Sequence, residues 1–301
     1  MLLASFGGGS VGTCIGGVPA FVMLGITVVA TILGGETVAS VLPVVSFGPW
    51  FCTHITFCGA VAASAYLHRK GISENGMDII TPLCKYKNWK ALFVGGAFGC
   101  LSYVINDVLS SAIGIHLFKN GSWTDTVALT IVLDNMAVRF VFGKTGLFGE
   151  RGPARRISQE RLSFLAALGF GAALVICGVA VVLGEQGFAG DAAALYMFKS
   201  MGTFGFGISA ILFILIPMGK PMECFHQILL PAATTTITIY TVCQNGILAL
   251  AGGVLMGIAG AIINDILALI FNTGTDTHID APSFTIALLQ LFNMSILPYM
   301  L

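Results

Sequence analysis

The 301-residue chain is 56% apolar and only 9% charged, and its formal net charge is zero. Soluble domains carry about 25% charged residues, so this chain lacks the polar surface that a water-soluble core needs. The mean hydropathy of +0.92 predicts an all-α polytopic membrane protein that is in contact with a lipid bilayer. The zero net charge argues against nucleic acid as a partner.

Apolar runs of about 20 residues predict the membrane spans in chain order. The first half contains the runs 11–34, 49–67, 91–117 and 123–143. A short apolar piece at 37–47 cannot span, so we expect it to enter the membrane and return. The glycines from Gly7 to Gly17 predict an unwound or re-entrant start to the first run. The second half contains the runs 161–184, 202–219, 221–241, 245–271 and 279–299, which gives about nine transmembrane helices with broken or re-entrant segments.

The two halves share a pattern. Gly95, Gly99, Asn106-Asp107 and Leu109 recur 158 residues later, as Gly253, Gly257, Asn264-Asp265 and Leu267. This spacing predicts two homologous repeats, at 1–148 and 161–301, joined by a basic linker at 149–160. The extra run at 202–219 favours inverted repeats if it crosses the membrane and parallel repeats if it does not. The small-residue spacing also permits close helix packing and a homo-oligomer.

Basic residues predict the orientation of the chain in the membrane. They cluster in two loops, one from Arg69 to Lys90 and the other from Lys144 to Arg161. The positive-inside rule places both loops in the cytoplasm. We expect the protein in the inner (plasma) membrane of a prokaryote. The sequence MLLASFGGGSVG lacks the basic region of a secretory signal, so we expect it to be part of the mature protein.

A Cys-x-His pair follows a proline in each half, as Cys52 and His54 after Pro49 and as Cys224 and His226 after Pro221. Proline favours the first turn of a helix, so we expect helices to begin at the prolines, with the histidines in the second turn. The four Cys and His side chains predict a metal site, or histidines that contact a proton or solute. Residues two apart on a helix point about 200° from each other, which argues against one pair binding one ion.

The Asn106-Asp107 and Asn264-Asp265 pairs are the strongest functional pattern. An ionised Asp at the centre of a membrane helix costs about 2.5–3.5 kcal/mol, so its recurrence predicts contact with water, an ion or a solute. The alternative is a polar clasp between helices, typically worth about 0.6 kcal/mol. Asn135 and Asn293 form a third matched pair. Asp134 and Arg139 have no counterparts, and we expect Arg139 to pair with Asp107.

The predicted function is a transporter or channel for a small polar solute or ion. Its path runs between the repeats and uses the intramembrane residues Asn106, Asp107, Asn264, Asp265, His54, His226, Asn135 and Asn293. The sequence does not identify a cofactor, for which a bound ion is one candidate, and no enzymatic activity is expected. The alternatives are a non-catalytic membrane subunit of a larger complex, and a metal-binding or redox protein that uses Cys52, His54, Cys224 and His226.

Overall fold

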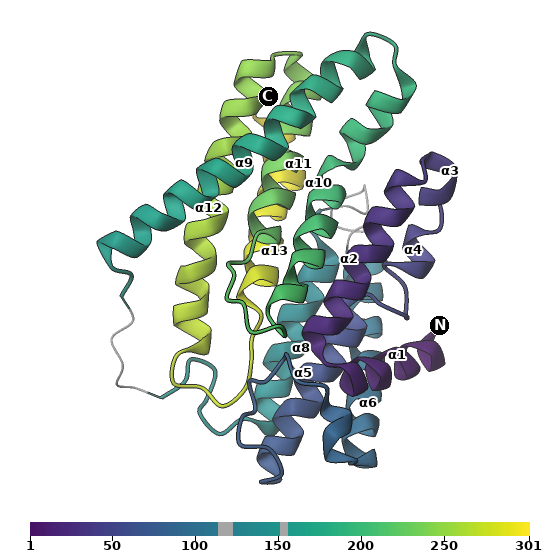
Figure 1. Ribbon diagram of the computed structural model, residues 1–301, viewed down its shortest axis with the longest axis vertical. Coiled ribbons are helices and arrows are strands. Elements are labelled where there is room, and N and C mark those ends of the chain that lie inside the picture. The colour runs from purple at the N-terminus through teal and green to yellow at the C-terminus, as the bar shows by residue number, and fades with distance from the viewer. Residues whose placement is uncertain (114–122, 151–155) are drawn as a thin grey trace.

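A computed structural model describes residues 1–113, 123–150 and 156–301, and this part of the chain is helical without any β-strand. The N-terminal half, coloured purple to teal, lies beside the C-terminal half, coloured green to yellow (Figure 1). The long helices of the first half are α1 (Leu2–Ile15), α2 (Gly17–Leu33), α5 (Thr53–Arg69), α6 (Trp89–Asp107) and α8 (Thr126–Phe142). Its short elements are α3 (Glu36–Ala39), α4 (Leu42–Val45), the 3-10 turn η1 (Leu83–Tyr86) and the π-helical turn η2 (Val108–Ile113).

The second half contains five long helices in succession. They are α9 (Gln159–Phe188), α10 (Ala192–Leu212), α11 (His226–Cys243), α12 (Gly246–Asn272) and α13 (Ala281–Ser295), with the 3-10 turns η3 (Phe213–Leu215) and η4 (Leu297–Tyr299). Helix α10 begins well before the predicted run at 202. The apolar signal is interrupted at Lys199 and Ser200, but the helix continues through them from its cap at Asp191.

Five helices among the described residues are long and apolar enough to cross a membrane. They occupy Trp89–Ser111, Gln159–Phe188, Ala192–Leu215, Gly246–Asn272 and Ala281–Tyr299. A sixth crossing is present if α1 and α2 count as one broken span. These lengths match the thickness of a bilayer, so the all-helical, membrane-integral character predicted from composition is confirmed.

The break between α1 and α2 bends the chain by 116° at Gly16. Gly16 has φ 93°, a conformation that glycine adopts at little cost. Of the unwound or re-entrant start predicted from Gly7 to Gly17, the unwound alternative is wrong for Gly7 to Gly12, which are helical, whereas the break at Gly16 fits a re-entrant segment or a broken span. A Cβ at Gly9 would lie 2.1 Å from the Gly95 carbonyl oxygen on α6. These glycines therefore serve close packing of α1 rather than loop formation.

Within the first half, α1 packs on α5 and α6, and α8 packs on α5. Within the second half, α9 packs on α11 and α12, and α13 packs on both of the latter. Between the halves, α2 lies against α10 and α8 lies against α13. This arrangement leaves the starts of four helices next to one another near the centre of the molecule.

Both of these inter-half pairs are antiparallel. In the middle of α2, a Cβ at Gly25 would lie 2.7 Å from the Gly207 carbonyl oxygen near the end of α10, whereas near the end of α2 the Ile32 carbonyl accepts a hydrogen bond at 3.1 Å from the Tyr196 hydroxyl near the start of α10. For α8 and α13, Thr124 Oγ1, just before α8, donates to the Ala287 carbonyl at 2.7 Å, whereas Asn135 Oδ1, farther along α8, accepts from the Asp280 amide at the start of α13. Position along one helix therefore increases as position along its partner decreases.

Candidate functional site in a cavity between the halves

A cavity of about 240 Å³ lies between α2, α5, α8, α10, α11 and α13. Its apolar wall includes five phenylalanines, namely Phe21, Phe47, Phe57, Phe206 and Phe213. Its polar lining includes two carboxylates, two imidazoles and two hydroxyls, from Asp125, Asp280, His226, His278, Thr53 and Ser283. Among the described residues, no lysine or arginine lines the cavity.

Four helices begin at this cavity. Thr53 is the first residue of α5 and His226 is the first residue of α11, while Asp125 and Asp280 cap the N-termini of α8 and α13. Asp125 Oδ1 accepts a hydrogen bond from the Ala128 amide at 2.9 Å, and Asp280 Oδ2 accepts one from the Ser283 amide at 2.9 Å. Each cap satisfies an amide that the helix leaves unpaired, and each helix start contributes a partial positive charge.

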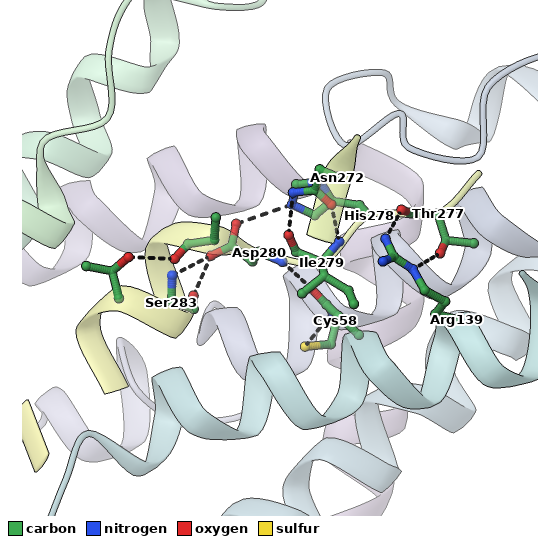
Figure 2. Close-up of polar contacts among 11 residues, drawn as sticks. Cys58, Arg139, Asn272, Thr277, His278, Ile279, Asp280 and Ser283 are labelled. Atoms are coloured by element: carbon green, nitrogen blue, oxygen red, sulfur yellow. Dashed lines mark hydrogen bonds and ion pairs between the residues drawn. The ribbon is translucent and has the colours of Figure 1, made fainter. Parts of the chain in front are cut away.

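The Asp280 carboxylate is held on several sides (Figure 2). His278 Nε2 lies 3.3 Å from Oδ1, and the Ser283 hydroxyl donates to Oδ2. The connection before the carboxylate is fixed by Asn272, whose Nδ2 donates to the Ile279 carbonyl at 2.7 Å and whose Oδ1 accepts from the Ile279 amide at 3.0 Å. Asp280 therefore faces the cavity from a rigid connection rather than from a loose loop.

His226 is buried, and its Nδ1 has no hydrogen-bond partner among the described residues. Three rings surround the imidazole, with centroids 5.0 Å away for Phe21, 5.9 Å for Phe206 and 5.4 Å for Phe213. Buried polar atoms are normally paired, and an unpaired one needs an explanation. A polar group of a solute in the cavity would supply this partner.

The helices that contain the two Cys-x-His pairs do not begin at the prolines, as was predicted. The helices start at Thr53 and His226, after the prolines rather than at them, so both histidines lie in the first turn. The expectation that Cys and His point apart is wrong for the first pair, since Cys52 Sγ lies 2.8 Å from His54 Nδ1. Cys52 is the residue before the helix, with ψ 131°, so helical geometry does not apply to it.

The four Cys and His residues do not assemble into one cluster. Across the described ranges, no group of three or more His, Cys, Asp or Glu side chains could hold a metal ion. Cys224 and His226 line the cavity, whereas Cys52 and His54 are buried beside Thr53. The thiols of Cys52 and Cys224 are free.

The Asn-Asp pairs lie outside the cavity lining. Asp107 is exposed at the end of α6. The Asp265 carboxylate instead binds Arg161, with Nε and Nη2 each at 2.8 Å, and the same guanidinium binds Glu223 at 2.6 and 3.0 Å. Asn106 Oδ1 lies 3.5 Å from Thr130 Oγ1, and Asn264 Oδ1 is buried without a partner.

The predicted pairing of Arg139 with Asp107 is wrong. Arg139 is buried, and its guanidinium donates to Thr277 Oγ1 at 2.8 Å and to the carbonyls of Leu147, Phe271 and Thr277. The hydrogen bonds of the Arg139 guanidinium are therefore accepted mainly by backbone carbonyl groups rather than by a carboxylate. The contacts attach α8 to the connection that leads to Asp280 (Figure 2).

Asn135 and Asn293 are both buried but have different partners. Asn135 Oδ1 accepts from the Asp280 amide at 3.1 Å, across the two halves. Asn293 bonds within the second half, to Thr235 Oγ1 at 2.7 Å, the Pro231 carbonyl at 3.0 Å and Gln290 Oε1 at 2.9 Å.

Sequence reasoning missed Asp125, His278 and Asp280 as cavity residues. Their local signal is a capping Asp directly before an apolar run, which marks a helix start. This local pattern does not predict which other helix starts lie next to it in the folded protein. The chain matches a family of unknown function, DUF7973, over residues 1–155 and 188–299.

The protein belongs to this family. The DUF7973 match covers the segments that carry Asp125, His226 and Asp280, so all four helix starts around the cavity lie within it. No curated protein and no solved structure matches the chain. The site is therefore interpreted from its own geometry.

Proposed function

We propose that this protein is a membrane transporter for a small organic solute, and that the cavity between the halves is its binding site. The observation that carries the proposal is the meeting of four helix starts, two from each half, around one cavity lined by carboxylates and imidazoles. Helices that begin within the membrane at a shared site are typical of secondary transporters with internal repeats.

The packing supports two homologous repeats, with α1, α2, α5, α6 and α8 corresponding to α9 through α13. In this correspondence α5 packs on α6 as α11 packs on α12, and α1 packs on α6 as α9 packs on α12. Asp125 and Asp280 cap corresponding helices. In this correspondence each repeat contains five long helices, and the number of membrane crossings, predicted as about nine, stays a prediction.

Inverted repeats account for the antiparallel pairs. Corresponding helices α2 and α10 run in opposite directions where they touch, and so do α8 and α13. Two copies related by a two-fold axis in the membrane plane would place each helix antiparallel to its counterpart. If each repeat crosses the membrane an odd number of times, the second repeat starts on the opposite side and therefore has the opposite orientation.

The basic loops support a single cytoplasmic side. A Cβ at Gly76, in the first basic loop, would lie 2.3 Å from the Asp276 carbonyl oxygen. Lys144, in the second loop, donates its amide to Asp276 Oδ2 at 2.7 Å. Both loops therefore contact the α12–α13 connection at one end of the molecule, and the positive-inside rule assigns this end to the cytoplasm of a prokaryotic inner membrane.

The cavity favours a small organic cation. Its lining contains two carboxylates and five phenylalanine rings, while none of its described lining residues is a lysine or arginine. Aromatic faces attract ammonium groups, by about 0.5–2 kcal/mol per contact. A carboxylate solute would meet the like charges of Asp125 and Asp280, which offset the partial positive charges of the helix starts at the cavity, so the lining does not favour anions.

Binding of two probes of similar size and opposite charge tests this proposal. Phenethylammonium and phenylacetate would be added separately to the purified protein, and the melting temperature Tm would be recorded. A ligand that binds the folded state raises Tm, so we expect phenethylammonium to raise it and phenylacetate to leave it unchanged. Asp280→Asn should abolish the shift, whereas Asp107→Asn, at an exposed site outside the cavity, should retain it.

Transport itself would be measured as uptake of radiolabelled phenethylammonium into proteoliposomes, with empty liposomes as the control for passive permeation. Saturable uptake that is lost in Asp280→Asn supports a transporter. A Tm shift with phenylacetate alone, or no binding of either probe, would overturn the assignment of a cation site.

A further inference from the structure

Asp134 on α8 is a carboxylate without a partner inside the helix bundle. Its exposure is 0%, and neither of its carboxylate oxygens forms a hydrogen bond within the described residues. The side chains of Ser102 on α6 and Cys58 on α5 interact with this carboxylate. Ser102 is also fully buried, and its hydroxyl has no partner either.

This cluster exists in one half only. In the repeat correspondence, Asp134, Ser102 and Cys58 match Phe292, Gly260 and Leu230. All three polar side chains are therefore replaced together by groups without a titratable or hydrogen-bonding side chain. If these residues served only packing, there would be no reason for all three to be polar in one half and apolar in the other. A polar site that is present in one repeat only explains why the three differ together.

The chemistry of the cluster selects its ligand. An ionised carboxylate in an apolar interior is so costly that the group normally neutralises instead. Hard metal cations need about six or more oxygen ligands, but the cluster offers one carboxylate, one hydroxyl and a thiol. A proton needs only one oxygen, and the neutral acid can donate one hydrogen bond to the free hydroxyl of Ser102.

The cluster is linked to the cavity. Asn135 follows Asp134 in the chain, donates from Nδ2 to Cys58 Sγ at 3.9 Å and accepts from the Asp280 amide. Cys58 is close enough to both Asp134 and Asp280 to interact with each of their carboxylates. Besides α5, the helices α6 and α13 pack against α8. Among their described residues, only the uncharged Ser102 acts on Asp134.

We propose that Asp134 is the proton-binding residue of the transporter, so that solute movement is coupled to a proton. The inference rests on the proposed function for its coupling role. While Asp134 is buried as it is here, one carboxylate oxygen carries the proton and the side chain is neutral. When the cavity opens on one side, that proton passes to water and leaves a carboxylate, which takes a proton from water on the other side.

Infrared spectroscopy tests the protonation state without any transport assay. A carbonyl stretching band of a protonated carboxylic acid, shifted in D₂O, is expected in the wild type and absent in Asp134→Asn. Asp107→Asn should retain the band, and Ser102→Ala should shift its frequency because the hydroxyl partner is removed. If the spectra of the wild type and Asp134→Asn differed only by the loss of an ionised carboxylate band, the proposal would be overturned.

Proteoliposomes then test the coupling. Asp134→Asn should still bind phenethylammonium and exchange it across the membrane, because Asp134 does not line the cavity, but an imposed pH gradient should no longer drive accumulation. Gradient-driven accumulation that persists in this variant would overturn the coupling role. If the wild type shows the protonated band but neither binds nor transports the probe, the proposed function fails while the proton site stands. Asp134→Glu keeps a carboxylic acid at this position and should show the protonated-acid band again, and a folded Asp134→Glu protein without that band would overturn the proposal.

Discussion

The side-chain carbonyl of Asn135 accepts a 3.1 Å hydrogen bond from the backbone amide of Asp280. A residue on α8 in the first half thereby fixes the residue that caps α13 in the second half. Its counterpart Asn293 bonds only to residues of its own half. The two matched asparagines therefore have different effects on the cavity, although both are buried.

Replacing Asn135 by Ala should weaken binding at the cavity. The Asp280 amide would lose its buried acceptor, which costs about 1–3 kcal/mol, and the carboxylate would lose its fixed position. We expect a lower affinity for phenethylammonium, measured by titration calorimetry. Asn293→Ala should lower the melting temperature comparably but leave the affinity near that of the wild type. Equal loss of affinity in both variants would contradict a specific role for the Asn135–Asp280 bond.

Arg139→Lys should destabilise the protein although the charge is retained. The guanidinium donates to a hydroxyl and to three carbonyls, and an ammonium with three donors on a shorter, unforked head cannot reproduce that geometry. Hydrogen bonds to charged groups are worth about 1.5–3 kcal/mol, so one lost bond should lower the melting temperature measurably. Arg69→Lys, at an exposed site at the end of α5, is the matched control. An unchanged melting temperature in Arg139→Lys would show that the four bonds are replaceable.

Hydrophobic patterning predicts the membrane helices of this chain well where one apolar run is one helix. The run at 245–271 corresponds to α12 (Gly246–Asn272), and the run at 123–143 corresponds to α8 (Thr126–Phe142). It fails where helices are interrupted by polar or small residues. Helix α1 contains Gly7, Gly8 and Gly9, which intrinsic propensity disfavours, but contacts with α5 and α6 stabilise it.

The candidate site was predictable only in part. His226 and Cys224 line the cavity, and their repeated motif drew attention to both. Asp125 and Asp280 were less visible, because an Asp before an apolar run is equally the pattern of a simple helix cap. Their joint position depends on the contact of α8 with α13, which is a long-range property that local sequence does not contain.

The Arg161 cluster should contribute little to stability despite its four short contacts. The side chains of Arg161 and Glu223 are 34% and 37% exposed, and exposed ion pairs are worth about 0–1 kcal/mol. A double-mutant cycle with Arg161→Met and Glu223→Gln, followed by chemical unfolding, should give a coupling free energy in that range. The coupling should fall at 1 M salt, where charges are screened beyond about 3 Å. A coupling of several kcal/mol that is insensitive to salt would show that the cluster is shielded from water.

Gly25→Leu should separate the two halves at the α2–α10 contact. A Cβ at Gly25 would lie 2.7 Å from Ala210 Cβ and 2.7 Å from the Gly207 carbonyl oxygen, so the larger side chain cannot fit without moving a helix. Overpacking of this kind costs about 1–3 kcal/mol, and the wall containing Phe21 and Phe206 would move with the helices. Both the melting temperature and the affinity for phenethylammonium should fall.

Gly171→Leu on α9 is the matched control for this variant, because a Cβ at Gly171 meets no atom within 4 Å. Both substitutions gain about the same helix propensity, close to 1 kcal/mol relative to glycine, so their difference isolates the packing at Gly25. We expect Gly171→Leu to be at least as stable as the wild type and to bind the probe normally. If Gly25→Leu behaved like Gly171→Leu, the two halves would not be in close contact at this position, and a cavity wall shared between α2 and α10 would be ruled out.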